Sequence, residues 1–180
     1  MPFGLSPFLL IAQAIGILGM LAQTGSFAFK DVKKLYVSQC LAAGLTIIHY
    51  LMIGGYSGMA MNMVGFVRCL CLGSKKPLAT GRLALIGILA FNAILGCFTL
   101  PSEGLIGLLP IIAQLIGTCS LWTRNNRTIH LIQLLLLSPA WATYAVVAGS
   151  LSGLLNEILT VLTILYYFVR YHGQHPNEHS

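Results

Sequence analysis

The chain has very few charged residues for its length. Asp, Glu, Lys and Arg make up 8% of its 180 residues, and only four of these residues are acidic. A water-soluble domain carries about 25% charged residues, whereas 57% of this chain is hydrophobic. Such a composition cannot cover a soluble surface, which excludes a globular cytosolic enzyme. The net charge of +6 does not indicate a nucleic-acid partner, because the positions of so few charges matter more than their sum.

The sequence also lacks the motifs of a metal site, a disulfide framework or a catalytic centre. Its five cysteines lie in apolar stretches, without the spacing of a zinc site or of a secreted disulfide framework. No nucleophile–base pair stands out either. We therefore expect no cofactor, no metal ion and no enzymatic activity.

Apolar runs separated by short polar or Gly/Pro breaks predict an all-α, polytopic membrane protein with seven transmembrane helices. No Lys or Arg occurs in the first seven residues, so the basic region of a cleaved signal peptide is missing and the first helix is expected to be retained. We expect one membrane domain, 1–180, with a disordered tail at 172–180. The predicted helices are 7–29, 35–53, 56–73, 78–99, 104–122, 128–147 and 150–171.

With seven crossings, every Lys and Arg falls on the same side of the membrane. The positive-inside rule then predicts an N-terminus outside and a C-terminus in the cytoplasm. With an even number of helices, Lys and Arg would lie on both sides of the membrane. The positions of the charges therefore support seven helices independently of hydropathy. The ten residues are Lys30, Lys33, Lys34, Arg68, Lys75, Lys76, Arg82, Arg124, Arg127 and Arg170.

The chain resembles itself when it is shifted by 94 residues without gaps. This predicts a repeat of three helices at 7–73 and again at 101–171, joined by a linker helix at 78–99. Three is odd, so a single linker helix gives both repeats the same orientation, a plan known among transporters. The polar and turn matches include Gln39 with Gln133, Tyr50 with Tyr144, Gly55 with Gly149 and Asn62 with Asn156.

Polar and aromatic residues fall in one band between the outer surface and the midplane, as judged by a rise of 1.5 Å per residue. A solute site between the repeats would use this band. Each residue type in the band also has an explanation that involves no solute. The Asn pair could form helix–helix hydrogen bonds, the aromatic residues could anchor the chain at the membrane interface, and the histidine could have a buried structural role. The candidate substrate-binding residues are Glu157, Asn156, Asn62, Trp141, Tyr144, Tyr50, His49 and Gln13.

Glu157 is the most informative of these residues. A carboxylate within a membrane span is costly when it faces lipid, so it should face the interior, a cavity or a partner. Arg68 lies near the cytoplasmic end of its helix, where its long side chain can extend to the headgroups. With no basic residue expected in the band, a neutral or cationic solute is favoured over an anion.

Several short motifs resemble the bacterial inner-membrane YgjV-type family. They are Trp141, residues 149–153, Glu157 and Arg170 in the last two helices, His49, Gly54 and Arg68 in the second and third, and residues 108–110 at the start of the fifth. The resemblance implies a multi-pass protein of the bacterial inner membrane and supplies no substrate. More distantly, the three-plus-one-plus-three plan is similar to the SWEET and PnuC-type transporters, which is an analogy of architecture only.

These observations lead to two hypotheses for function. The first is an inner-membrane transporter or facilitator of a vitamin-like or sugar-like solute, with its site between the two repeats. The alternative is a non-transporting seven-helix protein, such as a receptor or an assembly partner, which predicts a packed centre without a cavity. The expected partners are a small-molecule solute and the lipid bilayer, with a homo-oligomer possible.

Overall fold

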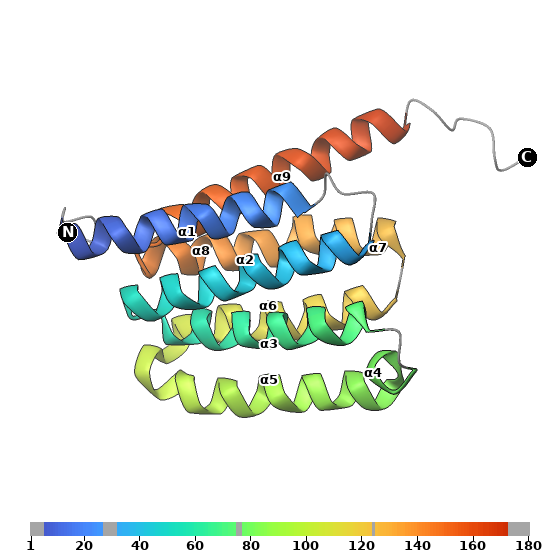
Figure 1. Ribbon diagram of the computed structural model, residues 1–180, viewed down its shortest axis with the longest axis horizontal. Coiled ribbons are helices and arrows are strands. Elements are labelled where there is room, and N and C mark those ends of the chain that lie inside the picture. Colours follow the sequence, from blue (N-terminus) through green and yellow to red (C-terminus); the bar gives the residue numbers. More distant parts are fainter. Residues whose placement is uncertain (1–5, 27–31, 75–76, 124, 173–180) are drawn as a thin grey trace, which may run out of the picture.

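The computed structural model describes residues 6–26, 32–74, 77–123 and 125–172, and in these ranges the chain is helical without strands. Seven long helical passes run back and forth along one axis (Figure 1). The elements are α1 (Pro7–Ser26), α2 (Val32–Ile53), α3 (Tyr56–Gly73), α4 (Pro77–Thr80), α5 (Arg82–Glu103), a 3-10 turn η1 (Gly104–Gly107), α6 (Leu108–Trp122), α7 (Asn126–Ile132), a π turn η2 (Gln133–Leu137), α8 (Ser138–Val147) and α9 (Leu151–His172).

The passes follow the predicted ranges closely, with one clear difference at the linker. A single turn, α4, precedes it, and the linker helix α5 begins at Arg82 and continues to Glu103 rather than ending at residue 99. Pro101, which was expected to open the second repeat, lies inside the last turn of α5, and the helix ends at Gly104, whose φ is +62°. Only His172 of the predicted tail lies within the described residues.

The surface of the molecule is apolar, as expected for a chain that contacts lipid. Large hydrophobic side chains such as Phe98 and Leu105 are exposed, whereas His49 and Thr118 are buried. Three segments of the described chain are long and apolar enough to cross a membrane, and two more apolar helices are shorter. The three segments are Pro7–Gly25, Arg82–Trp122 and Arg127–Val147, and the shorter helices are Val37–Ile53 and Leu151–Tyr166. That all seven passes cross the membrane stays a prediction.

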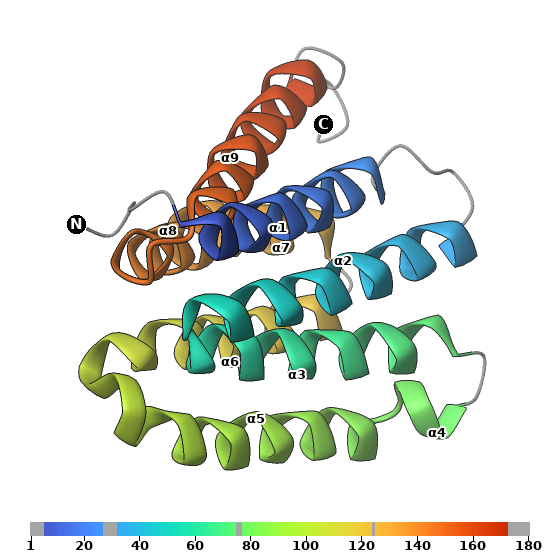
Figure 2. The same ribbon diagram turned by 60° about the vertical axis from the view of Figure 1, so that its left-hand side comes forward.

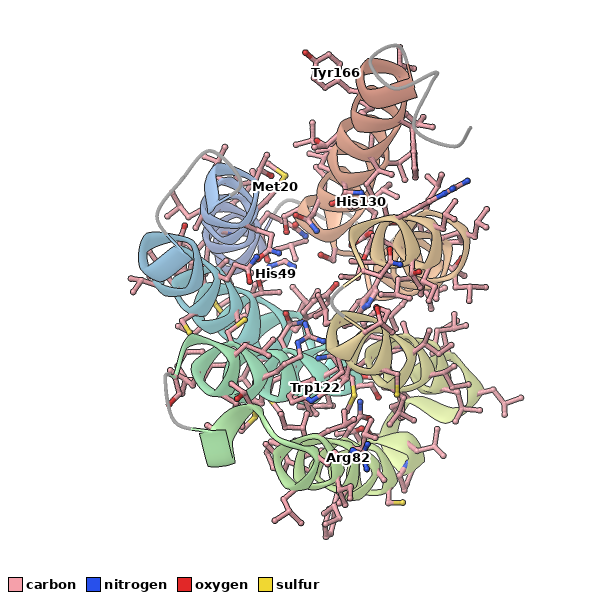
Figure 3. The ribbon with its side chains drawn as sticks, turned by 90° about the vertical axis from the view of Figure 1, so that its right-hand side faces the viewer. Met20, His49, Arg82, Trp122, His130 and Tyr166 are labelled. Atoms are coloured by element: carbon pink, nitrogen blue, oxygen red, sulfur yellow. The ribbon has the colours of Figure 1, made fainter. Side chains whose placement is uncertain are left out.

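Six passes form a closed ring. Contacts run from α1 to α2, α3, α6, α8, α9 and back to α1, while α5 packs outside against α3 and α6. Figure 3 looks along the helices and shows His49 inside this ring and Tyr166 projecting from it. A cluster that includes Met61, Ile88 and Ile111 fills the space between α3, α5 and α6, with Trp122 packed against it.

Two glycine turns close the ring at one end of the molecule, which we call the turn end. Gly54 and Gly149 have φ values of +78° and +71°, a conformation that side-chain-bearing residues rarely adopt. The following residues donate to carbonyls five positions back, Gly55 N to Tyr50 O and Ser150 N to Ala145 O, both at 2.8 Å. This is the Schellman pattern, which ends α2 and α8 in the same way.

The pass formed by α7 and α8 contains a π turn that α2 lacks. Ser138 N donates to Gln133 O, five residues back instead of four. Pro139 follows directly, and proline cannot donate a backbone hydrogen bond and crowds the carbonyl four residues earlier. The widened turn accommodates one extra residue in the pass.

Candidate functional site

A cavity of ≈ 560 Å³ lies inside the ring. Side chains from all six ring passes line it, and its volume is in the range of small-molecule sites, about 300–1,000 Å³. The lining reaches Leu121, next to the last residue of α6, at the end of the molecule opposite the turn end. We call this opposite end the basic end, because Arg82 and Arg127 lie there at the starts of α5 and α7.

Six of the eight predicted site residues line this cavity: Glu157, Asn156, Asn62, Trp141, Tyr50 and His49. Tyr144 and Gln13 do not line it but form hydrogen bonds at the turn end. Gln13 Nε2 donates to Gly149 O at 2.8 Å, and Gln13 Oε1 accepts from Ser152 N at 3.4 Å. Gln13 therefore holds the α8–α9 turn against α1.

We call α1–α2–α3 the first unit and α6–α7–α8–α9 the second unit of the ring, and hydrogen bonds between these two units close the turn end. His49 bonds through Nδ1 to Ala12 O in its own unit, and through Nε2 to Ser150 Oγ in the other unit, both at 2.7 Å. Tyr144 OH accepts from Gly58 N at 2.8 Å, which joins the units a second time. The ring of Tyr50 lies 5.6 Å from that of Tyr144, so aromatic side chains fill the space between these bonds.

Glu103 of α5 strengthens this closure. Its Oε1 accepts from Ser57 N at 2.9 Å and from Tyr144 OH at 3.3 Å. A carboxylate is favourable at the N-terminus of a helix, here α3, because the backbone N–H groups there have no partners within the helix. No sequence signal marked Glu103 as part of the closure, because its partners are distant in the chain.

Glu157 and Asn156 share one wall of the cavity. Asn156 Nδ2 donates to Glu157 Oε1 at 3.2 Å, and Glu157 is only 9% exposed. Its Oε2 is buried without a hydrogen bond to any residue that the structure describes. Asn62 Nδ2 donates to Gly58 O in its own helix at 2.8 Å.

Arg68 corrects one expectation from the sequence. Its side chain does not extend to the headgroups but lines the cavity and is half-buried. Nη1 donates to Thr118 Oγ1 at 3.3 Å and, with the Gln114 amide oriented toward its donors, to Gln114 Oε1 at 3.3 Å. Gly117 lies beside the guanidinium and packs closely against Leu137, since a Cβ there would lie 2.8 Å from Leu137 Cδ2. The predicted absence of a basic residue from the site is therefore wrong.

Positions counted from the starts of α3 and α9 differ by one residue from the alignment of the sequence comparison. Asn62 and Glu157 are both the seventh residue of their helices, α3 and α9, a shift of 95 residues. At this shift, every lining residue of α3 (61, 62, 65, 68, 69) has a lining counterpart in α9 (156, 157, 160, 163, 164). Gln39 and Gln133, the first residue of the π turn, both line the cavity at the predicted shift of 94. The one extra residue of the π turn accounts for the difference between the two shifts, and at a shift of 95 Asn62 aligns with Glu157 instead of Asn156.

Other cavity residues were missed from the sequence. Gln39 and Gln133 matched as a repeat pair there but were not assigned to the site, and Gln114, Thr160 and Thr163 also line it. The described residues contain no group of three His, Cys, Asp or Glu side chains that could hold a metal ion.

The family model of Imp-YgjV, described as a bacterial inner membrane protein, matches residues 10–175. The chain belongs to the YgjV family. It is thus a member of an inner-membrane protein family, in agreement with its apolar helices. No curated protein and no solved structure gave a match. The family therefore indicates the membrane in which the protein lies, and the function has to be argued from the cavity.

Proposed function

We propose that this YgjV-family protein is a transporter or facilitator of a small polar solute, which binds in the cavity between two three-helix units. The single observation that carries the proposal is a cavity of ≈ 560 Å³ whose mainly apolar lining includes several polar side chains, enclosed by both units and closed at one end by hydrogen bonds between them. A packed structural core would fill such a space, since protein interiors leave few voids larger than a water molecule.

The arrangement of contacts supports two parallel repeats. The first unit is α1–α2–α3 and the second is α6–α7–α8–α9, and the units meet through α3 with α6 and through α9 with α1. A two-fold rotation about the ring axis would place each unit on the position of the other. The same rotation would place the α3–α6 contact on the α9–α1 contact, as two parallel repeats require. The plan has the form of the parallel-repeat transporters.

The cavity supports an alternating-access cycle in which one unit rocks against the other. The turn end is closed by His49 with Ser150 and by Tyr144 with Gly58. Toward the basic end α9 leans away from α1 (Figure 2), and the lining reaches close to the helix ends. Rocking would break the two bonds at the turn end and bring the units together at the basic end.

Orientation follows from the charges. If the basic end is cytoplasmic, as the positive-inside rule predicts, the described conformation is closed to the outside. The expectation of a neutral or cationic solute depended on the absence of a basic residue, and the position of Arg68 removes that ground.

The alternative of a non-transporting receptor or assembly partner predicted a packed centre, and the cavity weighs against the assembly partner. A receptor could also bind a solute without moving it. Net movement of the solute across a sealed bilayer separates these two functions.

The test combines binding and transport in the purified protein. We expect a member of a panel of vitamins, nucleosides, sugars, amines and amino acids to raise the melting temperature and to enter proteoliposomes containing the protein. A ligand at 100 times its Kd stabilises by about 2.7 kcal/mol. Glu157→Gln should weaken both effects, whereas Thr143→Ala, at an exposed position of α8 outside the cavity, should leave them unchanged.

Stabilisation without uptake would favour a receptor. Neither stabilisation nor uptake across the panel would count against a solute site altogether. Uptake that is retained in both Glu157→Gln and Asn156→Ala would remove this cavity wall from the pathway.

A further inference from the structure

The cavity contains two ionisable side chains of opposite sign on opposite walls. Arg68 belongs to α3 and Glu157 to α9, and the order of contacts places two passes between these helices on each side of the ring. Arg68 is the thirteenth residue of α3 and Glu157 the seventh of α9. At 1.5 Å per residue this difference is about 9 Å along the ring axis, so the charges differ in depth as well as in wall.

Neither charge has a partner of opposite sign within the described residues. The partners of Arg68 are the neutral side chains of Thr118 and Gln114, and its Nε is buried without a hydrogen bond. The polar neighbours of Glu157 are the neutral side chains of Asn156 and Ser138, and its Oε2 is likewise buried without a well-aligned hydrogen bond. Removing a charge from water without compensation is costly, and a buried unsatisfied polar atom adds to the cost.

The two charges also break the symmetry of the site. The counterpart of Glu157 in the first unit is Asn62, and the counterpart of Arg68 in the second unit is Thr163. A neutral side chain therefore stands at the position equivalent to each charge. Arg68 and Glu157 therefore give the lining an electric dipole across the cavity. The other lining positions of α3 and α9 correspond one to one without such a difference in charge.

We propose that the solute is zwitterionic, with its ammonium group on the Glu157 carboxylate and its carboxylate on the Arg68 guanidinium. This inference rests on the proposed function, since it names the class of solute for the same cavity. A cation alone leaves Arg68 uncompensated, an anion alone leaves Glu157 uncompensated, and a sugar compensates neither. A zwitterion makes a charge-assisted hydrogen bond at both ends, and such bonds are roughly twice as strong as neutral ones.

The first experiment needs no variant. Glycine, 4-aminobutanoate and 6-aminohexanoate are compared with the alkylamine and the alkanoate of the same chain length, by melting temperature of the purified protein and by uptake into proteoliposomes. We expect at least one zwitterion to bind at least tenfold more tightly than both of its singly charged analogues. Equal or tighter binding of an amine or an alkanoate overturns the proposal.

Charge-removing variants provide the second readout. Glu157→Gln should weaken binding of the zwitterion about tenfold or more and leave the alkanoate unaffected, whereas Arg68→Gln should weaken the zwitterion and leave the alkylamine unaffected. Arg127→Gln, which removes the same charge at an exposed position, is the matched control. Loss of all ligands alike in both cavity variants would indicate a structural role and contradict the proposal.

The outcome also separates this inference from the function on which it rests. If a sugar or nucleoside from the wider panel is bound and transported while no zwitterion is preferred, the transporter stands and the zwitterion class is wrong. If nothing is bound or transported, both fail.

Discussion

At the scale of single residues, the close packing at the turn end requires a glycine, which has no side chain, at position 58. A Cβ added to Gly58 would lie 2.7 Å from Tyr144 Cε1 and 2.9 Å from Tyr50 Cδ1. These distances are shorter than any contact that a real Cβ makes, and the neighbours are rigid aromatic rings. Gly58 is therefore required by the close packing of the two units and not by its backbone conformation.

We expect Gly58→Ala to lower the free energy of unfolding by about 1–3 kcal/mol, the usual cost of overpacking. Gly44→Ala is the control, because a Cβ at Gly44 meets nothing within 4 Å. That substitution should be neutral or stabilising by up to about 1 kcal/mol through helix propensity. Unfolding of the detergent-solubilised proteins measures both, and equal stability of the two variants would contradict the packing argument.

Asn92 on α5 is a second residue whose environment yields a prediction. It is fully buried, and both polar atoms of its amide lack hydrogen bonds among the described residues. Replacing it with a similarly sized apolar residue removes that penalty, so Asn92→Leu should raise the free energy of unfolding by about 1–2 kcal/mol. Gln114→Leu should do the opposite, because it removes bonds to Gly65 N and Arg68. A loss of stability in Asn92→Leu would reveal a polar partner for this side chain.

At the scale of elements, the π turn sets the rotation of α8 relative to α7. Gln133 at the start of the turn and Trp141 after it both line the cavity. In a continuous helix, removal of one residue would rotate everything beyond it by about 100°, since 3.6 residues complete a turn. The π turn contains one residue in excess, so a deletion there can restore an ordinary α-helix.

We therefore expect deletion of Leu135, an exposed residue in the π turn, to preserve folding and the cavity. Deletion of Leu41, the exposed counterpart 94 residues earlier in the continuous helix α2, should abolish folding. Size-exclusion profiles and the yield of folded protein in detergent distinguish these outcomes. Similar behaviour of the two deletions would show that the π turn does not carry the extra residue.

At the scale of the whole molecule, the placement of the ends predicts an orientation in the membrane. Ser102 is exposed near the turn end and Asn125 is exposed at the basic end. In a variant without native cysteines, Ser102→Cys should react with a membrane-impermeant maleimide in intact spheroplasts, and Asn125→Cys only after lysis. The reverse pattern would place the basic end outside and invert the direction in which the cavity opens.

Sequence alone predicted the helices well and the site in part. Long apolar runs and the glycine turns gave boundaries within a few residues for most passes, because these signals act locally. The sequence also indicated Glu157, His49 and Tyr50, since polar side chains in an apolar helix must face the interior. Gln13 and Tyr144 were also assigned to the site, and in the structure they lie outside the cavity lining and form hydrogen bonds at the turn end. Their partners lie in the other unit, so no local pattern could distinguish lining from closure.

What the sequence by itself determined is an all-helical membrane chain, because a helix satisfies its own backbone hydrogen bonds in lipid. Only the tertiary structure decided that Arg68 shares a cavity with Glu157 and that Asn62 and Glu157 occupy the same position in α3 and α9. The first depends on Thr118 and Gln114, polar partners from another helix that bind the guanidinium. The second depends on one π turn, whose inserted residue no ungapped comparison of the two halves can detect.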